Sequence, residues 1–91
     1  MPPAELTDEQ VKALILNFLL RRKRWGARYY NRQRMVRSLG LDVLGDGKVV
    51  SRCMDELVKS RWVNLHKKGD TISLNTSYIR EITGHIDRHL I

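Results

Sequence analysis

The spacing of apolar residues changes along the chain from a helical period to strict alternation, and this change restricts the fold most. Over 7–25 and 48–60, apolar residues recur every three or four positions, as on one face of an amphipathic helix. Over 62–66 and 71–75 they alternate, which predicts two strands, and Lys67-Lys68-Gly69-Asp70 predicts the turn between them. The chain has 91 residues, enough for one domain with one core. We therefore expect a single α+β domain that is mainly α-helical.

Capping and stop signals mark the first two helices. Thr7-Asp8-Glu9-Gln10 has the form of a capping box, in which the Thr7 and Gln10 side chains satisfy each other's backbone N–H groups. The helix that begins there is expected to end at Gly26. A short extended segment is expected over 27–30, and Asn31 is a suitable cap for a second helix through about Leu39.

Two further helices are expected, one on each side of the hairpin in sequence. A linker with two glycines over 41–47 precedes the third helix, which is expected over about 48–60. Thr76 or Ser77 is expected to cap the fourth helix. The apolar stripe of that helix comprises Ile79, Ile82, Ile86 and Leu90. Such a stripe serves either as the surface of a homodimer or, more commonly, as part of the core packed on the first helix.

The charge of the chain indicates a polyanionic partner. Seventeen Lys and Arg against ten Asp and Glu give a net charge of +7 and an isoelectric point near 10.1, although solubility alone sometimes explains such a balance. No acidic residue lies between Glu9 and Asp42. The basic residues there are Lys12, Arg21, Arg22, Lys23, Arg24, Arg28, Arg32, Arg34 and Arg37. Arginine suits phosphate well, and Trp25, Tyr29 and Tyr30 either stack on bases or, more commonly, pack half in the core.

The order helix, strand, helix, helix, hairpin, helix resembles that of winged helix-turn-helix domains, over residues 7–90. The segment 50–63 is similar to the recognition helix of bacterial and archaeal regulators of that superfamily, followed by the first strand of the wing. Residues 35–41 resemble the preceding helix and its turn, and 72–75 resemble the return strand. The turn over 42–49 is longer than usual in the superfamily, which predicts an earlier start of the third helix or an unusual angle between the two helices.

The resemblance implies that the third helix enters the major groove of duplex DNA, with Lys48, Ser51 and Arg52 reaching base edges. Lys67 and Lys68 at the tip of the wing would grip the backbone or the minor groove, unless they belong to a solvated turn. Arginines on the second helix would cross the phosphates. These are Arg32, Arg34 and Arg37. The function expected first is therefore duplex DNA binding, as in a transcriptional regulator.

Other interpretations of the basic and acidic residues stay open. Arg52 could instead form an ordinary pair with Glu56 on its own helix. RNA binding, as in a ribosome-associated factor, would depend mainly on the basic stretch 21–37. A winged helix that binds protein within a larger assembly is the third hypothesis. It is favoured by Asp55 and Glu56 on the supposed recognition helix, because DNA phosphates would repel them.

No pattern in the sequence indicates an enzyme, a cofactor or a metal site. Cys53 falls on the apolar face of the third helix, where packing is its expected role. His85 and His89, four residues apart, could share a metal ion, but no cysteine or third histidine lies nearby and Asp87 faces another way. No glycine-rich loop follows a strand to hold a phosphate.

The remaining expectations concern location and the chain ends. The lone cysteine, the absence of a secretory pattern and the short apolar runs favour a cytoplasmic protein without a membrane partner, associated with the nucleoid if it is prokaryotic. Residues 1–6 are expected to form a disordered tail, and residues 7–91 the domain.

Overall fold

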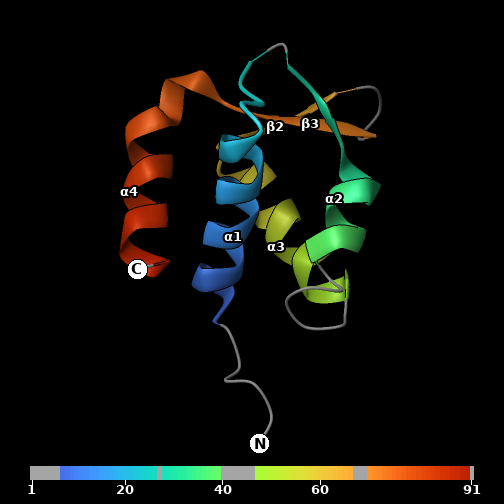
Figure 1. Cartoon of the computed structure of the whole chain (residues 1–91), viewed down its shortest axis with the longest axis horizontal. Helices are drawn as coiled ribbons and strands as arrows, with labels where there is room; N and C mark the ends of the chain where they lie inside the picture. The colour runs from blue at the N-terminus through green and yellow to red at the C-terminus, as the bar shows by residue number, and fades with distance from the viewer. Residues whose placement is uncertain (1–6, 27, 40–46, 67–69, 91) are drawn as a thin grey trace, which may run out of the picture.

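A computed structural model describes residues 7–26, 28–39, 47–66 and 70–90 (Figure 1). Its elements are α1 (Asp8–Arg21), β1 (Tyr30–Asn31), α2 (Arg32–Leu39), α3 (Gly47–Lys59), β2 (Val63–His66), β3 (Thr71–Leu74), the 3-10 turn η3 (Thr76–Tyr78) and α4 (Ile79–His89). The expected mainly helical α+β class and the order of elements are both confirmed. The predicted tail 1–6, the linker 41–46 and the wing tip 67–69 lie outside the described residues.

A three-stranded antiparallel sheet lies across one end of the helices, with the strand order β1-β3-β2 (Figure 1). Tyr30 of β1 stands opposite Ile72 of β3, and Val63 of β2 stands opposite Leu74. The short segment before α2 therefore joins the hairpin as an edge strand. The Asn31 side chain accepts a hydrogen bond from the backbone N–H of Arg34 at 2.9 Å, so the predicted cap of α2 is confirmed.

The first helix begins where the sequence predicts but ends earlier. Thr7 Oγ1 accepts from Gln10 N at 3.1 Å and Gln10 Oε1 accepts from Thr7 N at 2.9 Å, which completes the capping box. At the other end, the N–H groups of Lys23 and Arg24 bond to the carbonyls of Leu20 and Leu19, with Lys23 at φ +55°. This is a Schellman closure in which lysine takes the left-handed position that glycine usually occupies.

The prediction that Gly26 ends α1 is therefore wrong, because the helix closes at Lys23. Gly26 lies beside the central strand instead, where its N–H donates to Leu74 O at 3.0 Å. Its carbonyl accepts from the Ser73 hydroxyl at 2.7 Å. The φ of Gly26 is +60°, a conformation that favours a residue without a side chain.

The fourth helix packs against α1 and completes the core. Ile82 and Ile86 are buried, but Ile79 of the same predicted stripe is 47% exposed. The expected cap at Thr76 or Ser77 is wrong: the Asn75 side chain accepts from Ser77 N and starts η3, so α4 begins only at Ile79. Since Ile82 and Ile86 serve the core of the chain itself, a homodimer through α4 would depend on outer residues such as Ile79.

All the main elements contribute buried side chains to one core. From α1, α2, α3, the hairpin and α4 these include Ile15, Leu16, Leu19, Met35, Val50, Cys53, Met54, Leu57, Val63, Ile72, Leu74 and Ile82. Helix α1 lies centrally, with α4 on one side and α2 on the other (Figure 1). None of the described helices has both the length and the apolar character needed to cross a membrane.

Candidate nucleic-acid interface

The solvent-facing row of α3 is mainly basic. Four residues spaced three or four positions apart along the helix are exposed. They are Lys48, Arg52, Asp55 and Lys59. Lys48 and Arg52 were predicted for this surface, whereas Lys59 was missed, although its spacing from Arg52 and Asp55 places it on the same row. The row thus presents three cations and one carboxylate to solvent.

Arg52 forms its ion pair with another helix rather than with its own. Its Nη2 lies 2.6 Å from Asp8 Oδ1 in the first turn of α1, and the two side chains are 59% and 49% exposed. The Asp8 carboxylate raises the pKa of Arg52 further. The alternative of a pair between Arg52 and Glu56 is wrong, because Asp8, 44 residues away in sequence, lies within hydrogen-bond distance.

The two carboxylates of α3 are each balanced by a cation from a neighbouring helix. Arg32 Nη2 of α2 lies 2.6 Å from Asp55 Oδ1 and 3.4 Å from the Ser51 hydroxyl. On the α1 side, Lys12 Nζ lies 3.7 Å from Glu56 Oε1. The charge of Asp55 is therefore compensated locally, whereas that of Glu56 is compensated only in part, because Lys12 also lies 3.5 Å from Glu9 Oε1.

Exposed arginines of α2 extend the basic surface beyond α3. Arg34 and Arg37 are exposed, and in the described parts of the chain neither side chain forms an ion pair. An open hollow of about 470 Å³ lies where α2 meets α3. Its lining residues are Arg32, Gln33, Val36, Arg37, Ser51 and Asp70. The structure thus brings Arg32, Arg37 and Ser51 together there, whereas Lys48 and Arg52 lie on the outer row of α3.

A second group of cations lies at the end of α1, where the aromatic rings are already in contact with arginine. The Arg22 guanidinium lies 3.6 Å from the centre of the Phe18 ring, and that of Arg24 lies 5.4 Å from the centre of Tyr30. Tyr29 stacks on His66 with 3.9 Å between ring centres. These contacts agree with the packing role expected for the aromatic residues, and they leave less ring surface for nucleic-acid bases.

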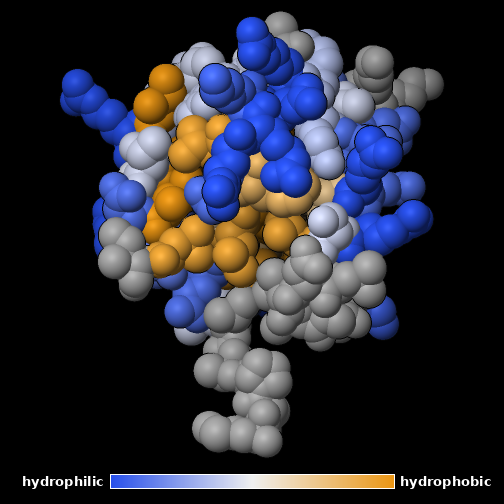
Figure 2. All heavy atoms as spheres, in the orientation of Figure 1, coloured by the Kyte–Doolittle hydropathy of each residue, from blue (hydrophilic) through white to orange (hydrophobic). Residues whose placement is uncertain are grey.

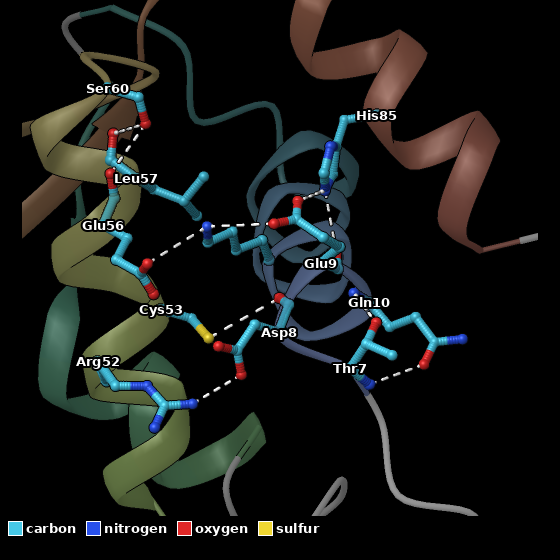
Figure 3. A network of polar contacts seen from close by, with 11 residues as sticks. Thr7, Asp8, Glu9, Gln10, Arg52, Cys53, Glu56, Leu57, Ser60 and His85 are labelled. Atoms are coloured by element: carbon cyan, nitrogen blue, oxygen red, sulfur yellow. Dashed lines mark hydrogen bonds and ion pairs between the residues drawn. The ribbon is translucent and has the colours of Figure 1, made fainter.

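Cys53 and the histidines of α4 lie apart from the outer row of α3. Cys53 is buried, and burial raises the pKa of its thiol, so it stays protonated and unreactive at neutral pH. His85 and His89 lie next to Glu9 of α1 (Figure 3 shows His85 and Glu9), with His85 Nε2 3.4 Å from Glu9 Oε2. Sequence reasoning missed Glu9 as their neighbour, because it is 76 residues from His85.

The predicted residues of the wing tip, Lys67 and Lys68, lie outside the described residues. Figure 2 shows how hydrophilic and apolar side chains are distributed on this face: hydrophilic side chains gather at the sheet end and over α2, and apolar ones gather over α1.

Comparisons of the chain with protein-family models, with curated proteins and with solved structures found no match.

Proposed function

We propose that this chain is a winged helix-turn-helix protein that binds duplex DNA through the outer row of α3 and the flanking arginines of α2. The observation that carries the proposal is the outer row itself, in which Lys48, Arg52 and Lys59 are exposed and Asp55 is paired with Arg32. A helix of this kind fits the major groove, and its N-terminal residues read base edges there.

The topology supports the same assignment. Strand β1 lies between the first two helices in sequence and pairs with the hairpin strand β3 at the sheet edge. Together with α2, α3 and the hairpin, this is the arrangement that the resemblance to winged helix-turn-helix domains implies. The hairpin β2–β3 would then be the wing, whose tip meets the DNA backbone beside the recognition helix.

The proposed contacts fall into two classes. Lys48 and Arg52 would reach base edges, and Arg52 would exchange the Asp8 carboxylate for the O6 and N7 acceptors of guanine. Arg34 and Arg37 would bind phosphates, which positions the protein without reading the sequence. Arg32, held by Asp55 and Ser51, would orient α3 against α2. A protein with this division of contacts suits a transcriptional regulator.

Binding to RNA is the second candidate, favoured by the exposed cations at the end of α1. Arg21, Lys23 and Arg28 are exposed there, and they are not part of the outer row of α3. Binding to a protein partner is the third candidate, for which Leu65 and Ile79 are the exposed aliphatic side chains in the described residues. The pairing of Asp55 and Glu56 within the chain weakens the argument for a protein partner that these carboxylates provided.

A comparison of two triple variants tests the proposal. One variant replaces Lys48, Arg52 and Lys59 with alanine, and its matched control replaces Arg21, Lys23 and Arg28. Arg22 and Arg24 are left intact because they pack on Phe18 and Tyr30. Binding to a mixed-sequence duplex and to single-stranded RNA is measured by fluorescence anisotropy at low salt.

Loss of duplex binding in the α3 variant alone is the expected result. Loss of binding only in the control variant, together with a preference of the unmodified chain for RNA, would favour RNA binding. If the unmodified chain binds neither nucleic acid, binding to a protein partner is the remaining candidate.

A further inference from the structure

We propose that Glu9, His85 and His89 form a binding site for a divalent transition-metal ion, Zn²⁺ foremost, between the first turn of α1 and the end of α4. One ligand atom from each residue lies within 4.8 Å of the other two. The site is independent of nucleic-acid binding, because none of its residues belongs to the outer row of α3 or to α2.

The backbone of α4 and its packing against α1 bring the three side chains together. His85 and His89 are four residues apart, so they project from one face of the helix, and their ring centres lie 4.4 Å apart. Glu9 projects from the first turn of α1 toward them. His85 Nε2 lies 3.4 Å from Glu9 Oε2. Two ligands held about 2.0–2.1 Å from a tetrahedral Zn²⁺ ion are separated by nearly this distance, roughly 3.4 Å.

The chemistry of the donor set suits zinc. Two imidazole nitrogens and one carboxylate oxygen are the ligands of known three-residue zinc sites, whereas Mg²⁺ and Ca²⁺ prefer oxygen ligands alone. His89 is partly buried and only 11% of the His85 side chain is exposed, and the Trp62 ring packs edge-on against His85 with 5.6 Å between ring centres. Glu9 is about half exposed, which leaves solvent access for a water molecule as the fourth ligand.

Two contacts in the structure compete with the metal, and both can yield to it. His85 Nε2 lies 2.9 Å from the backbone carbonyl oxygen of Glu9, so this nitrogen carries a proton and must lose it before it coordinates. Lys12 Nζ lies 3.5 Å from Glu9 Oε1. The other oxygen, Oε2, faces His85, so Glu9 can hold the ion with one oxygen and keep Lys12 on the other.

A bound ion would link the two helices at positions distant in sequence. The link joins the start of α1 to the end of α4 and exists only in the folded chain. Zn²⁺ would therefore raise the melting temperature in proportion to the logarithm of its concentration above the dissociation constant.

Four single variants of the full, untagged chain test the site by calorimetric titration with ZnCl2 at neutral pH. Glu9→Gln and His89→Gln each remove one ligand. Asp87→Asn is the control for the lost carboxylate charge, because Asp87 is exposed on another face of α4. His66→Gln is the control for the lost imidazole, because His66 contacts Ser73 and Tyr29 instead.

The expected result is one Zn²⁺ per chain, with the dissociation constant raised at least about tenfold in the two ligand variants and unchanged in the two controls. Zinc should also raise the melting temperature of the unmodified chain, an effect reversed by EDTA and absent in Glu9→Gln. No zinc binding by the unmodified chain would overturn the proposal. Equal binding by Glu9→Gln and His89→Gln, or an equal loss in His66→Gln, would overturn it too.

Discussion

The salt dependence of DNA binding should report how many cations of α2 and α3 displace counterions from the DNA, whether they contact phosphates or lie in the major groove. Five exposed cations face solvent on these helices: Arg34, Arg37, Lys48, Arg52 and Lys59. Arg32 is not counted, because only 19% of its side chain is exposed, whereas the Arg52 side chain is 59% exposed and can exchange Asp8 for DNA. If each of the five displaces one counterion, the slope of log affinity against log salt is about −4.5. The unmodified chain would then lose roughly 500-fold in affinity between about 50 and 200 mM salt.

Replacing Arg34 and Arg37 with alanine removes two of these contacts. The slope should fall to about −2.7, and the loss over the same salt range to roughly 40-fold. Both side chains are exposed and form no ion pair in the described residues, so the fold should persist, which circular dichroism can check. Anisotropy titrations of a labelled duplex at several salt concentrations measure the slope.

The matched control replaces Arg80 and Arg88, two exposed arginines of α4, and removes the same charge from another part of the surface. Its slope should stay near −4.5. An unchanged slope in the α2 variant, or an equal decrease in the α4 control, would refute the assignment of the phosphate contacts to α2.

Three further predictions follow from single contacts. Asp8→Asn releases Arg52 and should tighten duplex binding by up to about fivefold, whereas Asp87→Asn should not; weaker binding of Asp8→Asn in an anisotropy titration would contradict a role for Arg52. Lys23→Gly relieves a left-handed residue at φ +55° and should raise the free energy of unfolding by about 0.5–1 kcal/mol, measured with urea; a decrease would contradict the strain. Burial raises the pKa of Cys53 above its ordinary 9.0, so the folded chain favours the neutral thiol. The stability that the neutral thiol contributes is lost as the pH rises above about 9. Between about pH 8 and 10.5, the urea midpoint of the unmodified chain should therefore decrease more than that of Cys53→Ala, and an equal decrease would show that the thiol does not contribute.

Local chemistry in the sequence was sufficient to predict most of the secondary structure. The capping box at Thr7, the Asn31 cap and the alternation over 62–66 and 71–75 each involve residues a few positions apart. Such signals act within a single turn or strand, so they operate whatever the rest of the chain does. Helical spacing also predicted Lys48 and Arg52 for the outer row of α3, but Lys59 of the same row was not included in the predicted site.

The end of α1 and the start of α4 depend on more than the conformational preferences of the residues there. Gly26 is the best left-handed residue near the end of α1, yet the helix closes at Lys23 and Gly26 packs against β3. At the other helix, Asn75 starts η3 and delays α4 to Ile79. In both places tertiary packing selects which of several acceptable residues ends or begins the helix.

The ion pairs and the histidine cluster were decided only by the tertiary structure. Asp8 meets Arg52 across 44 residues, Arg32 meets Asp55 across 23, and Glu9 meets His85 across 76. The sequence by itself determined that these charges exist and which face of its helix each one occupies. Their partners follow from how α1, α2 and α4 pack around the shared core, because the positions of side chains on different helices are set by the burial of apolar residues and not by the charges themselves.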